Sequence, residues 1–175
     1  MYILSIQPSI ANQFIAELRN IQIQKDRMRF RKNLERLGEI LAYEISKSME
    51  YNVVEIETPL AKSKIEVPNH QPVIIAVLRA SLPFYQGFLN FFDNAESGFI
   101  GAFREEKDDD ITINLGYHAS PDITGKELIL ADPMLATGKS LIKSINALLT
   151  HGQPKFIHIA SVFAAPEGVE YITNN

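Results

Sequence analysis

The sequence predicts an α/β fold in which a mainly parallel sheet is flanked by helices. Two continuous apolar runs, Val73–Leu78 and Leu128–Ala131, have the length and composition of strands buried on both faces. A third strand is expected over Phe156–Phe163, where the side chains alternate. Stretches with apolar residues at helical spacing separate these strands. Such alternation of strands and helices is typical of a parallel sheet covered by helices.

Helices are expected in the N-terminal part of the chain, residues 1–50. A short helix is predicted around Leu18, and a long amphipathic helix over Arg27–Met49. The apolar stripe of the long helix consists of Phe30, Leu34, Leu37, Leu41 and Ile45. A basic cluster at its start favours a solvated helix end or a subunit contact over an RNA surface. The cluster consists of Lys25, Arg27, Arg29, Arg31 and Lys32.

The middle of the chain is expected to add three strands and a helix. Val53–Thr58 alternates as a strand, and Pro59 ends it. The spacing predicts a helix over Leu82–Phe92, whose aromatic stripe fits the core better than a ligand site. Gly98–Phe103 and Ile111–Tyr117 are predicted to be neighbouring strands.

Residues 103–118 are expected to form a flexible β-arm around the turn between these two strands. The acidic run Glu105–Asp110 lies within it. This run fits a metal cluster or a solvated hairpin tip, and a charge run of this kind favours the tip. No protein side chain is therefore assigned as a metal ligand.

Composition limits the classes of protein that this chain can belong to. Its 175 residues predict one domain over residues 1–175, and 46% hydrophobic residues supply a sizeable core. The net charge of −4 argues against a nucleic-acid partner. The sequence contains no cysteine, which excludes disulfides and thiolate metal sites. It has neither a signal-peptide pattern nor an apolar run of the roughly 20 residues that span a bilayer, so we expect a cytoplasmic protein without a membrane partner.

The stretch Glu127–Ser140 carries the strongest functional pattern. A predicted strand ends at a carboxylate, Asp132, and a loop of small residues over positions 136–140 leads into a helix over Leu141–Leu149. The first N–H groups of a helix have no partner within it, and its dipole favours an anion there by about 0.3–1 kcal/mol. A carboxylate at the strand end suits ribose hydroxyls, because it only accepts hydrogen bonds. The order therefore predicts a ribose 5-phosphate site.

The loop also resembles the end of a Walker A motif, in Thr137-Gly138-Lys139-Ser140. The leading glycine of that motif would stand at position 133, where this chain has Pro133. We therefore reject a P-loop. Lys139 is left with two roles, a phosphate contact or an exposed residue at the helix start, and exposure is favoured because the backbone already supplies donors.

Three predicted strand ends deliver charged side chains to one edge of the sheet. They are Arg79 after Val73–Leu78, Arg104 after Gly98–Phe103, and Asp132. Arginine presents a planar fork of donors that suits phosphate oxygens. Either arginine alone would fit a surface ion pair, but together with the phosphate loop they indicate a phosphate-rich ligand.

The segments that contain these charged residues and the phosphate loop resemble those of a known protein family. Leu128–Ser140 resembles the phosphoribosyl pyrophosphate (PRPP) motif of type I phosphoribosyltransferases, and Asp132–Gly138 is similar to its form in uracil phosphoribosyltransferases. Leu78–Leu82 resembles the pyrophosphate loop of the family, and Ile100–Glu106 the start of its flexible arm. Similar segments extend the resemblance over nearly the whole chain; they are Leu41–Glu44, Glu57–Leu60 and Ala164–Gly168.

The resemblance implies a glycosyltransferase that converts uracil and PRPP to UMP and pyrophosphate in pyrimidine salvage. It implies Mg²⁺ bound mainly through PRPP, and a homo-oligomer. Asp132, Arg79 and Arg104 are the implied catalytic residues. The implied PRPP-binding residues are Arg79, Arg104, Asp132, Pro133, Met134, Leu135, Ala136, Thr137, Gly138, Lys139 and Ser140.

The uracil site has no candidate residue in this sequence. Family members continue into a Gly-Asp-Ala-Gly-Asp-type segment that holds the base, and no such segment stands before Asn175. We therefore expect this chain to bind PRPP and to turn over uracil poorly or not at all, and we expect the natural protein to be longer. Two alternatives remain: a PRPP-binding regulatory protein without turnover, and another nucleotide- or phosphate-binding α/β protein.

Overall fold

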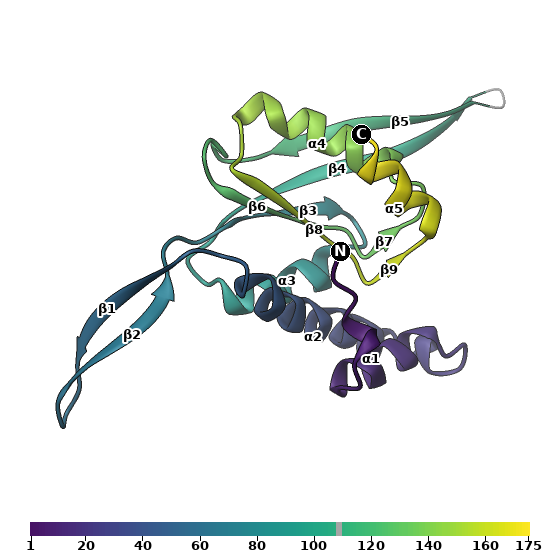
Figure 1. The fold of residues 1–175 in the computed structure, drawn as a ribbon. Coiled ribbons are helices and arrows are strands. Elements are labelled where there is room, and N and C mark those ends of the chain that lie inside the picture. The colour runs from purple at the N-terminus through teal and green to yellow at the C-terminus, as the bar shows by residue number, and fades with distance from the viewer. Residues whose placement is uncertain (108–109) are drawn as a thin grey trace.

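The computed structural model describes residues 1–107 and 110–175, and the side chains outside residues 102–115. Its centre is a five-stranded sheet with the order β5–β4–β3–β6–β8 (Figure 1). The strands are β3 (Val73–Leu78), β4 (Glu96–Lys107), β5 (Asp110–Ala119), β6 (Glu127–Ala131) and β8 (Phe156–Ala160). Strand β3 is parallel to β4 and β6, β6 is parallel to β8, and only β5 runs antiparallel. The predicted mainly parallel α/β fold is confirmed.

Helices cover both faces of this sheet (Figure 1). On one face lie α2 (Arg27–Ser46) and α3 (Leu82–Phe91), with α1 (Ile10–Arg19) packed on α2; on the other lies α4 (Lys139–Leu148). Short 3₁₀ turns complete the helical elements; they are η1 (Leu4–Ile6), η2 (Ile23–Lys25) and η3 (Leu149–His151). No helix in the described part of the chain is both long and apolar enough to cross a membrane.

The alternation of side chains along β3 divides the core between the two faces. Ile74 and Ala76 are fully buried against the α1–α2–α3 layer, whereas Ile75 is fully buried on the side of α4. Both faces are apolar because the strand is covered twice, which is why its sequence is a continuous apolar run. Strand β6 shows the same pattern, and all of its residues are buried.

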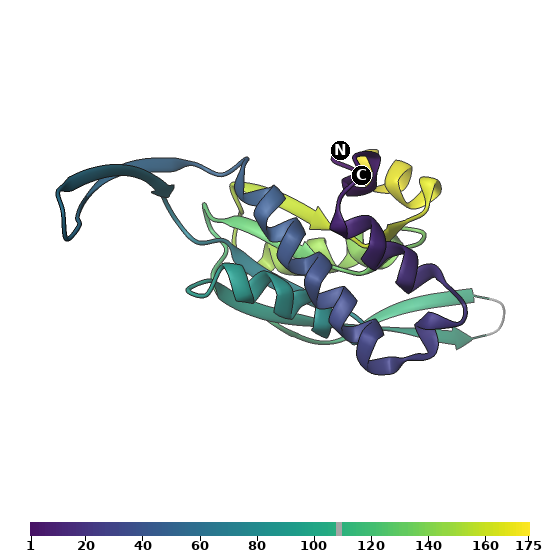
Figure 2. The ribbon, with the colours of Figure 1, turned by 90° about the horizontal axis from the view of Figure 1, so that it is seen from below.

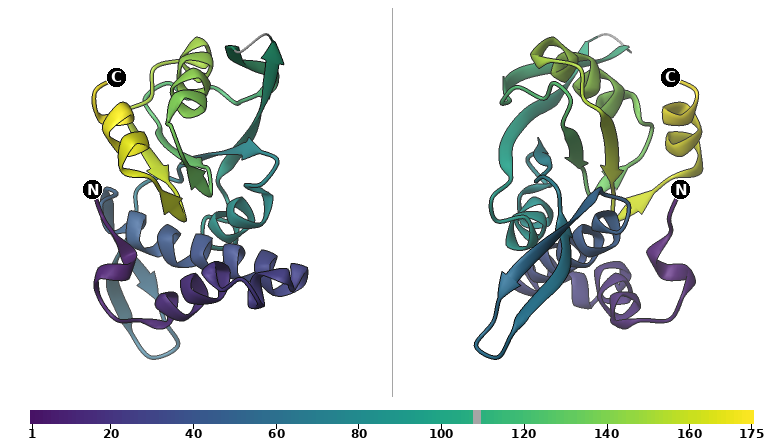
Figure 3. Two further views of the ribbon diagram at one scale, coloured as in Figure 1. Left: turned by 90° about the vertical axis from the view of Figure 1, so that its right-hand side faces the viewer. Right: turned by 60° about the vertical axis from the view of Figure 1, so that its left-hand side comes forward.

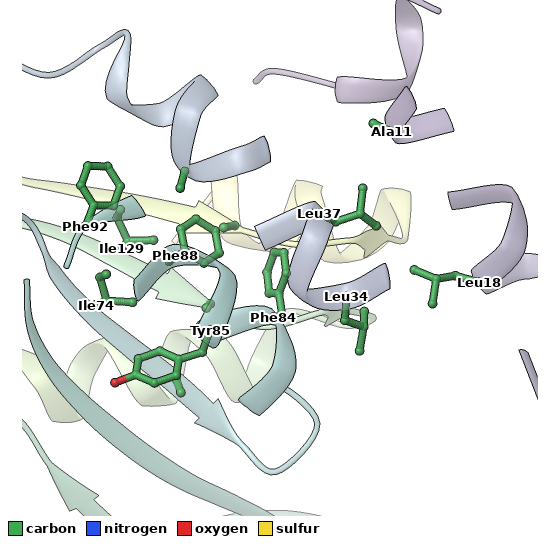
Figure 4. Packing of buried hydrophobic residues seen from close by; sticks show 14 of the residues in the cluster. Ala11, Leu18, Leu34, Leu37, Ile74, Phe84, Tyr85, Phe88, Phe92 and Ile129 are labelled. Carbon is green, nitrogen blue, oxygen red and sulfur yellow. The ribbon is translucent and has the colours of Figure 1, made fainter. Parts of the chain in front are cut away.

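The core beneath α2 is built on aromatic rings from α3 (Figure 4). Phe84 and Phe88 are fully buried and meet edge to face with ring centroids 5.1 Å apart. Leu37 of α2 packs in the same cluster. The two helices approach closely at Gly38, where a β-carbon would overlap the backbone of Phe84. The predicted aromatic stripe therefore belongs to the core.

A two-stranded hairpin projects from the body of the molecule (Figures 1 and 2). It consists of β1 (Tyr51–Glu57) and β2 (Lys62–Pro68), which pair only with each other among the described strands. The sequence predicted β1 but missed β2. Because most of both strands is exposed, β2 lacks the buried alternation by which a strand is recognised.

The C-terminal part differs from the sequence prediction. The strand expected over Phe156–Phe163 ends at Ala160, and the chain continues into β9 (Phe163–Ala164) and α5 (Pro166–Thr173), which lies near α4 (Figure 3). Pro166 and Gly168 in this segment suggest turns from the sequence, but Pro166 stands in the first turn of a helix, where its missing N–H is not needed. A short strand, β7 (Met134–Leu135), pairs in parallel with β9 and was also not predicted.

Candidate active site

A pocket of about 160 Å³ opens at the carboxyl ends of the neighbouring strands β3 and β6. Parallel strands place their carboxyl ends together, and ligands bind in the crevice outside them. The pocket joins the residues after β3 to the loop that connects β6 with α4. It is lined by Val77, Leu78, Arg79, Ala80, Asp132, Met134, Leu135, Ala136, Thr137, Gly138, Ser140 and Leu141.

The loop between β7 and α4 has the geometry expected of an anion site. Gly138 adopts a left-handed conformation, with φ of 74°, directly before the first residue of α4. A glycine accepts this conformation without strain and has no side chain to occupy the first N–H groups of the helix. The hydroxyl-bearing residues Thr137, which is exposed, and Ser140, which is half-buried, both line the pocket. These residues are those of the loop that the sequence predicted to bind phosphate.

Asp132 lies one residue after the end of β6 and lines the same pocket. One carboxylate oxygen, Oδ1, accepts a hydrogen bond from the backbone N–H of Met134 at 3.1 Å. Burial raises the pKa of the Asp132 carboxyl, and the Met134 hydrogen bond offsets only part of this effect. A carboxylate deprived of water gains when ligand hydroxyls donate to it, so its position favours a polyhydroxylated group such as ribose.

The two predicted arginines belong to neighbouring strands, but only Arg79 follows a strand end. The prediction that Arg104 follows a strand ending at Phe103 is wrong, because β4 continues to Lys107. Arg79 follows β3, is exposed, and lines the same pocket as the loop. The backbone of Arg104 lies in β4, the neighbour of β3, but its side chain lies outside the described residues. The acidic run 105–110 lies outside the described side chains as well. Among the described residues, no group of three or more potential ligands could hold a metal ion.

Two predicted PRPP-binding residues whose side chains are described do not line the pocket. Pro133 is buried, and its carbonyl oxygen accepts a hydrogen bond from the backbone N–H of Phe163 at 3.0 Å. Lys139 is exposed at the first position of α4. The other predicted loop residues, together with Arg79 and Asp132, all line the pocket.

The sequence analysis missed Ser161, which supports the site through the backbone of Asp132. The Ser161 hydroxyl donates to the backbone carbonyl oxygen of Asp132 at 2.7 Å, and the backbone N–H of Asp132 donates to Ala160 at 3.1 Å. No local pattern marks Ser161, because the contact joins segments that are far apart in the chain. Ala80 and Leu141, which also line the pocket, are neighbours of predicted site residues.

A separate polar cluster lies at the opposite end of β6. The carboxylate of Glu127, a residue only 5% exposed, stands 3.1 Å from His158 Nε2 and 3.3 Å from His70 Nε2. Glu127 begins β6, whereas Asp132 follows its end, so the length of the strand separates the cluster from the pocket. These histidines therefore support the fold and lie outside the candidate site.

Comparison with known proteins agrees with this geometry. The family model described as uracil phosphoribosyltransferase matches residues 5–175. The chain belongs to the uracil phosphoribosyltransferase family. A protein of Porphyromonas gingivalis named uracil phosphoribosyltransferase is 50% identical over 170 residues, which cover 97% of this chain and 79% of that protein. A protein of the same name from Sulfolobus acidocaldarius is 37% identical over 180 residues, covering 97% of this chain and 81% of its own length.

Solved structures show the same fold. A structure of an Aquifex aeolicus protein superposes with a TM-score of 0.84 at 28% identity and covers 99% of this chain and 81% of that one. A purine phosphoribosyltransferase from Pyrococcus horikoshii superposes with a TM-score of 0.56 at 18% identity, over 77% of this chain and 74% of that one. The architecture of this uracil phosphoribosyltransferase family member is therefore that of the type I phosphoribosyltransferases.

Proposed function

We propose that this protein transfers the 5-phosphoribosyl group of PRPP to uracil, producing UMP and pyrophosphate. The observation that supports this proposal is the meeting, in one pocket, of a strand-end carboxylate, a phosphate loop at a helix start and an arginine from the neighbouring strand. Family membership and the names of the relatives agree with it.

Each part of PRPP has a matching group in the pocket. The loop from Ala136 to Ser140 would bind the 5′-phosphate through backbone N–H groups and hydroxyls. The carboxylate of Asp132 would accept hydrogen bonds from the ribose hydroxyls. Arg79, at the end of the neighbouring strand β3, would bind the pyrophosphate. In this arrangement the ribose of PRPP would lie between the bound 5′-phosphate and the bound pyrophosphate. Its reactive carbon, C1, would thereby be held in place.

The chemistry needs positioning and charge stabilisation more than a protein nucleophile. The bond from the ribose C1 carbon to pyrophosphate breaks, a bond to a uracil nitrogen forms, and that nitrogen loses its proton to water. Positive charge develops on the ribose while negative charge gathers on the leaving pyrophosphate. We propose that Arg79 and Arg104 stabilise that negative charge in the transition state.

Mg²⁺ belongs to this proposal as part of the substrate. The described side chains provide no cluster of ligands for a resident metal, whereas PRPP itself is rich in oxygen ligands. Bound to PRPP, the ion would neutralise phosphate charge. We assign no protein residue to it.

An assay with radiolabelled uracil tests the proposal. The chain is incubated with PRPP and Mg²⁺, and UMP is separated from uracil; Asp132→Asn serves as the matched inactive variant. We expect UMP formation that depends on PRPP and on Asp132. UMP formation that is equal in the Asp132→Asn variant would contradict the proposed role of the pocket.

A regulatory protein that binds PRPP without turnover is the second candidate. One observation favours it: the polar side chains that line the pocket are Arg79, Asp132, Thr137 and Ser140, and each is already assigned to a part of PRPP. Among the described residues, the pocket lining therefore offers no further polar side chain to read the edge of the base, which enzymes need for selectivity. PRPP binding without UMP formation from radiolabelled uracil would select this candidate.

We also propose that the chain forms a homo-oligomer through the β1–β2 hairpin. Leu60 at its turn is 98% exposed, Val53 is 62% exposed and Ile65 is 50% exposed. A two-stranded ribbon without further packing is marginally stable in water, so a second copy covering these side chains would stabilise it. Sedimentation velocity of the wild type and of Val53→Lys tests this: we expect the variant to dissociate, and a monomeric wild type would contradict the proposal.

A further inference from the structure

The phosphate loop packs against the segment formed by residues 163–168. Met134–Leu135 pairs in parallel with Phe163–Ala164, so the loop begins as a strand of a separate two-stranded sheet. The backbone N–H of Ala165 donates to the carbonyl oxygen of Leu135 at 2.8 Å. Directly after Ala165, helix α5 begins against the loop.

The contact between α5 and the loop is made by two glycines. A β-carbon on Gly168 would overlap the carbonyl oxygen of Ala136 and stand 3.0 Å from its carbonyl carbon. In the other direction, a β-carbon on Gly138 would stand 2.9 Å from the carbonyl oxygen of Gly168 and 3.2 Å from the ring of Tyr171. At Gly168 the helix therefore meets only backbone atoms of the loop, whereas at Gly138 the loop meets backbone of Gly168 and the side chains of Ile172 and Tyr171.

Ser161 fixes the other end of the same loop. Its hydroxyl lies 2.7 Å from the carbonyl oxygen of Asp132 and 3.1 Å from that of Phe163. A hydroxyl has a single proton, so it is shared between these two acceptors. Contacts with residues 160–168 thus hold both Asp132 and the loop that follows it in position. Residues 160–168 do not themselves line the pocket.

We propose that Gly168 is a positioning residue that sets the shape of the 5′-phosphate loop, with Ser161 as its partner at Asp132. This inference deepens the proposed phosphoribosyl transfer and rests on it. The position next to Ala136 requires glycine because any β-carbon pushes the carbonyl group, and with it the N–H groups of the following residues, away from the phosphate. Such donors lose strength steeply as their distance and angle change.

The inference predicts a selective effect on ligands. Ribose 5-phosphate depends on the loop, whereas pyrophosphate is proposed to depend on Arg79 at the end of another strand. A displaced loop should weaken the first ligand and spare the second. Loss of overall stability, in contrast, would weaken both ligands together.

Calorimetry with these two ligands, in the presence of Mg²⁺, tests the inference on Gly168→Ala. We expect its affinity for ribose 5-phosphate to fall by about tenfold, as small misplacements at a binding site do. We expect its pyrophosphate affinity to stay within about twofold of the wild type. Glu167→Ala is the matched control, because Glu167 is an exposed neighbour in the same turn of α5. The control should bind both ligands as the wild type does.

A second variant tests the inference without added bulk. Ser161→Ala removes only the hydroxyl at Asp132, and we expect a loss of roughly threefold in ribose 5-phosphate affinity, the size of one modest hydrogen bond, with pyrophosphate unaffected. This variant decides the matter if Gly168→Ala does not fold. Ribose 5-phosphate affinity unchanged in the folded variants, or equal losses for both ligands, would overturn the inference. A wild type that binds neither ligand would instead overturn the proposed function itself.

Discussion

Asp132 Oδ1 accepts a hydrogen bond from the backbone N–H of Met134 at 3.1 Å, and burial nevertheless raises the pKa of the carboxyl. The carboxylate is thus partly removed from water. Among the described contacts, only one hydrogen-bond donor of the chain, the N–H of Met134, compensates its charge. Such a group is costly in the free protein and is satisfied by a ligand that donates to it. This environment agrees with the proposal that Asp132 binds a ligand.

Asp132→Asn should lose PRPP affinity while keeping the fold. The change is nearly isosteric, but an amide offers one accepting oxygen where the carboxylate offers two. We expect a loss of roughly 1.5–3 kcal/mol in binding, the range for a hydrogen bond to a charged group. Calorimetry measures the affinity, and a thermal melt should show a variant at least as stable as the wild type at neutral pH. Unaltered PRPP binding with a collapsed melting temperature would make Asp132 a structural residue.

The same carboxyl should make binding and stability depend on pH in opposite directions. In the proposed site the ionised form would accept hydrogen bonds from ribose, so PRPP affinity should fall as the pH is lowered through the raised pKa of Asp132. A carboxyl whose folded pKa is raised contributes stability below its ordinary value of 3.8, and that contribution is lost as the pH rises through the folded pKa.

Titration of PRPP over a pH series, in the wild type and in Asp132→Asn, checks this dependence. Affinity should fall more steeply at acid pH in the wild type than in Asp132→Asn. The difference between the two profiles reports the Asp132 carboxyl, since the phosphates of PRPP titrate equally in both experiments. Identical pH profiles for the two proteins would contradict the assignment.

Arg79→Ala should separate the two ends of PRPP. Arg79 follows β3, whereas the phosphate loop follows β6, so the variant should weaken pyrophosphate and PRPP and leave ribose 5-phosphate nearly unchanged. We expect a loss on the order of 1.5–3 kcal/mol for the charge-assisted contact. Arg27→Ala, an exposed arginine at the start of α2, controls for the change in net charge. Equal losses for both ligands would count against a pyrophosphate role.

Lys139→Gly should leave PRPP affinity within about threefold of the wild type, because backbone N–H groups already supply the donors of the loop. The exposed position of Lys139 outside the described pocket lining agrees with this expectation. Calorimetry with PRPP at two salt concentrations distinguishes a direct contact from long-range attraction. A tenfold loss that persists at high salt would show the lysine to be a phosphate ligand.

Sequence reasoning predicts those parts of this fold whose pattern of burial or backbone conformation is visible in the residues of a single element. Strand β6 is apolar throughout because both faces are covered, and Gly138 stands where the chain must turn left-handed into α4. The end of that apolar run is enough to place Asp132 at the edge of the sheet.

The missed parts depend on contacts between distant segments or on exposure. Strand β2 has no buried face to give it a pattern, and β7 exists only because β9 lies beside it. In the sequence of helix α5, Pro166 and Gly168 suggest a turn, yet the proline starts the helix and the glycine lets it approach Ala136. Ser161 carries no motif, since its role is defined only by the carbonyl group of Asp132.

The central claim is that the pocket between Arg79 and the phosphate loop is a PRPP site, and calorimetric competition between PRPP and ATP tests it most directly. In the presence of Mg²⁺, PRPP should bind saturably, ribose 5-phosphate and pyrophosphate should each displace it, and ATP should not. Displacement of PRPP by ATP with equal or higher affinity, or no binding of PRPP at all, would contradict the account.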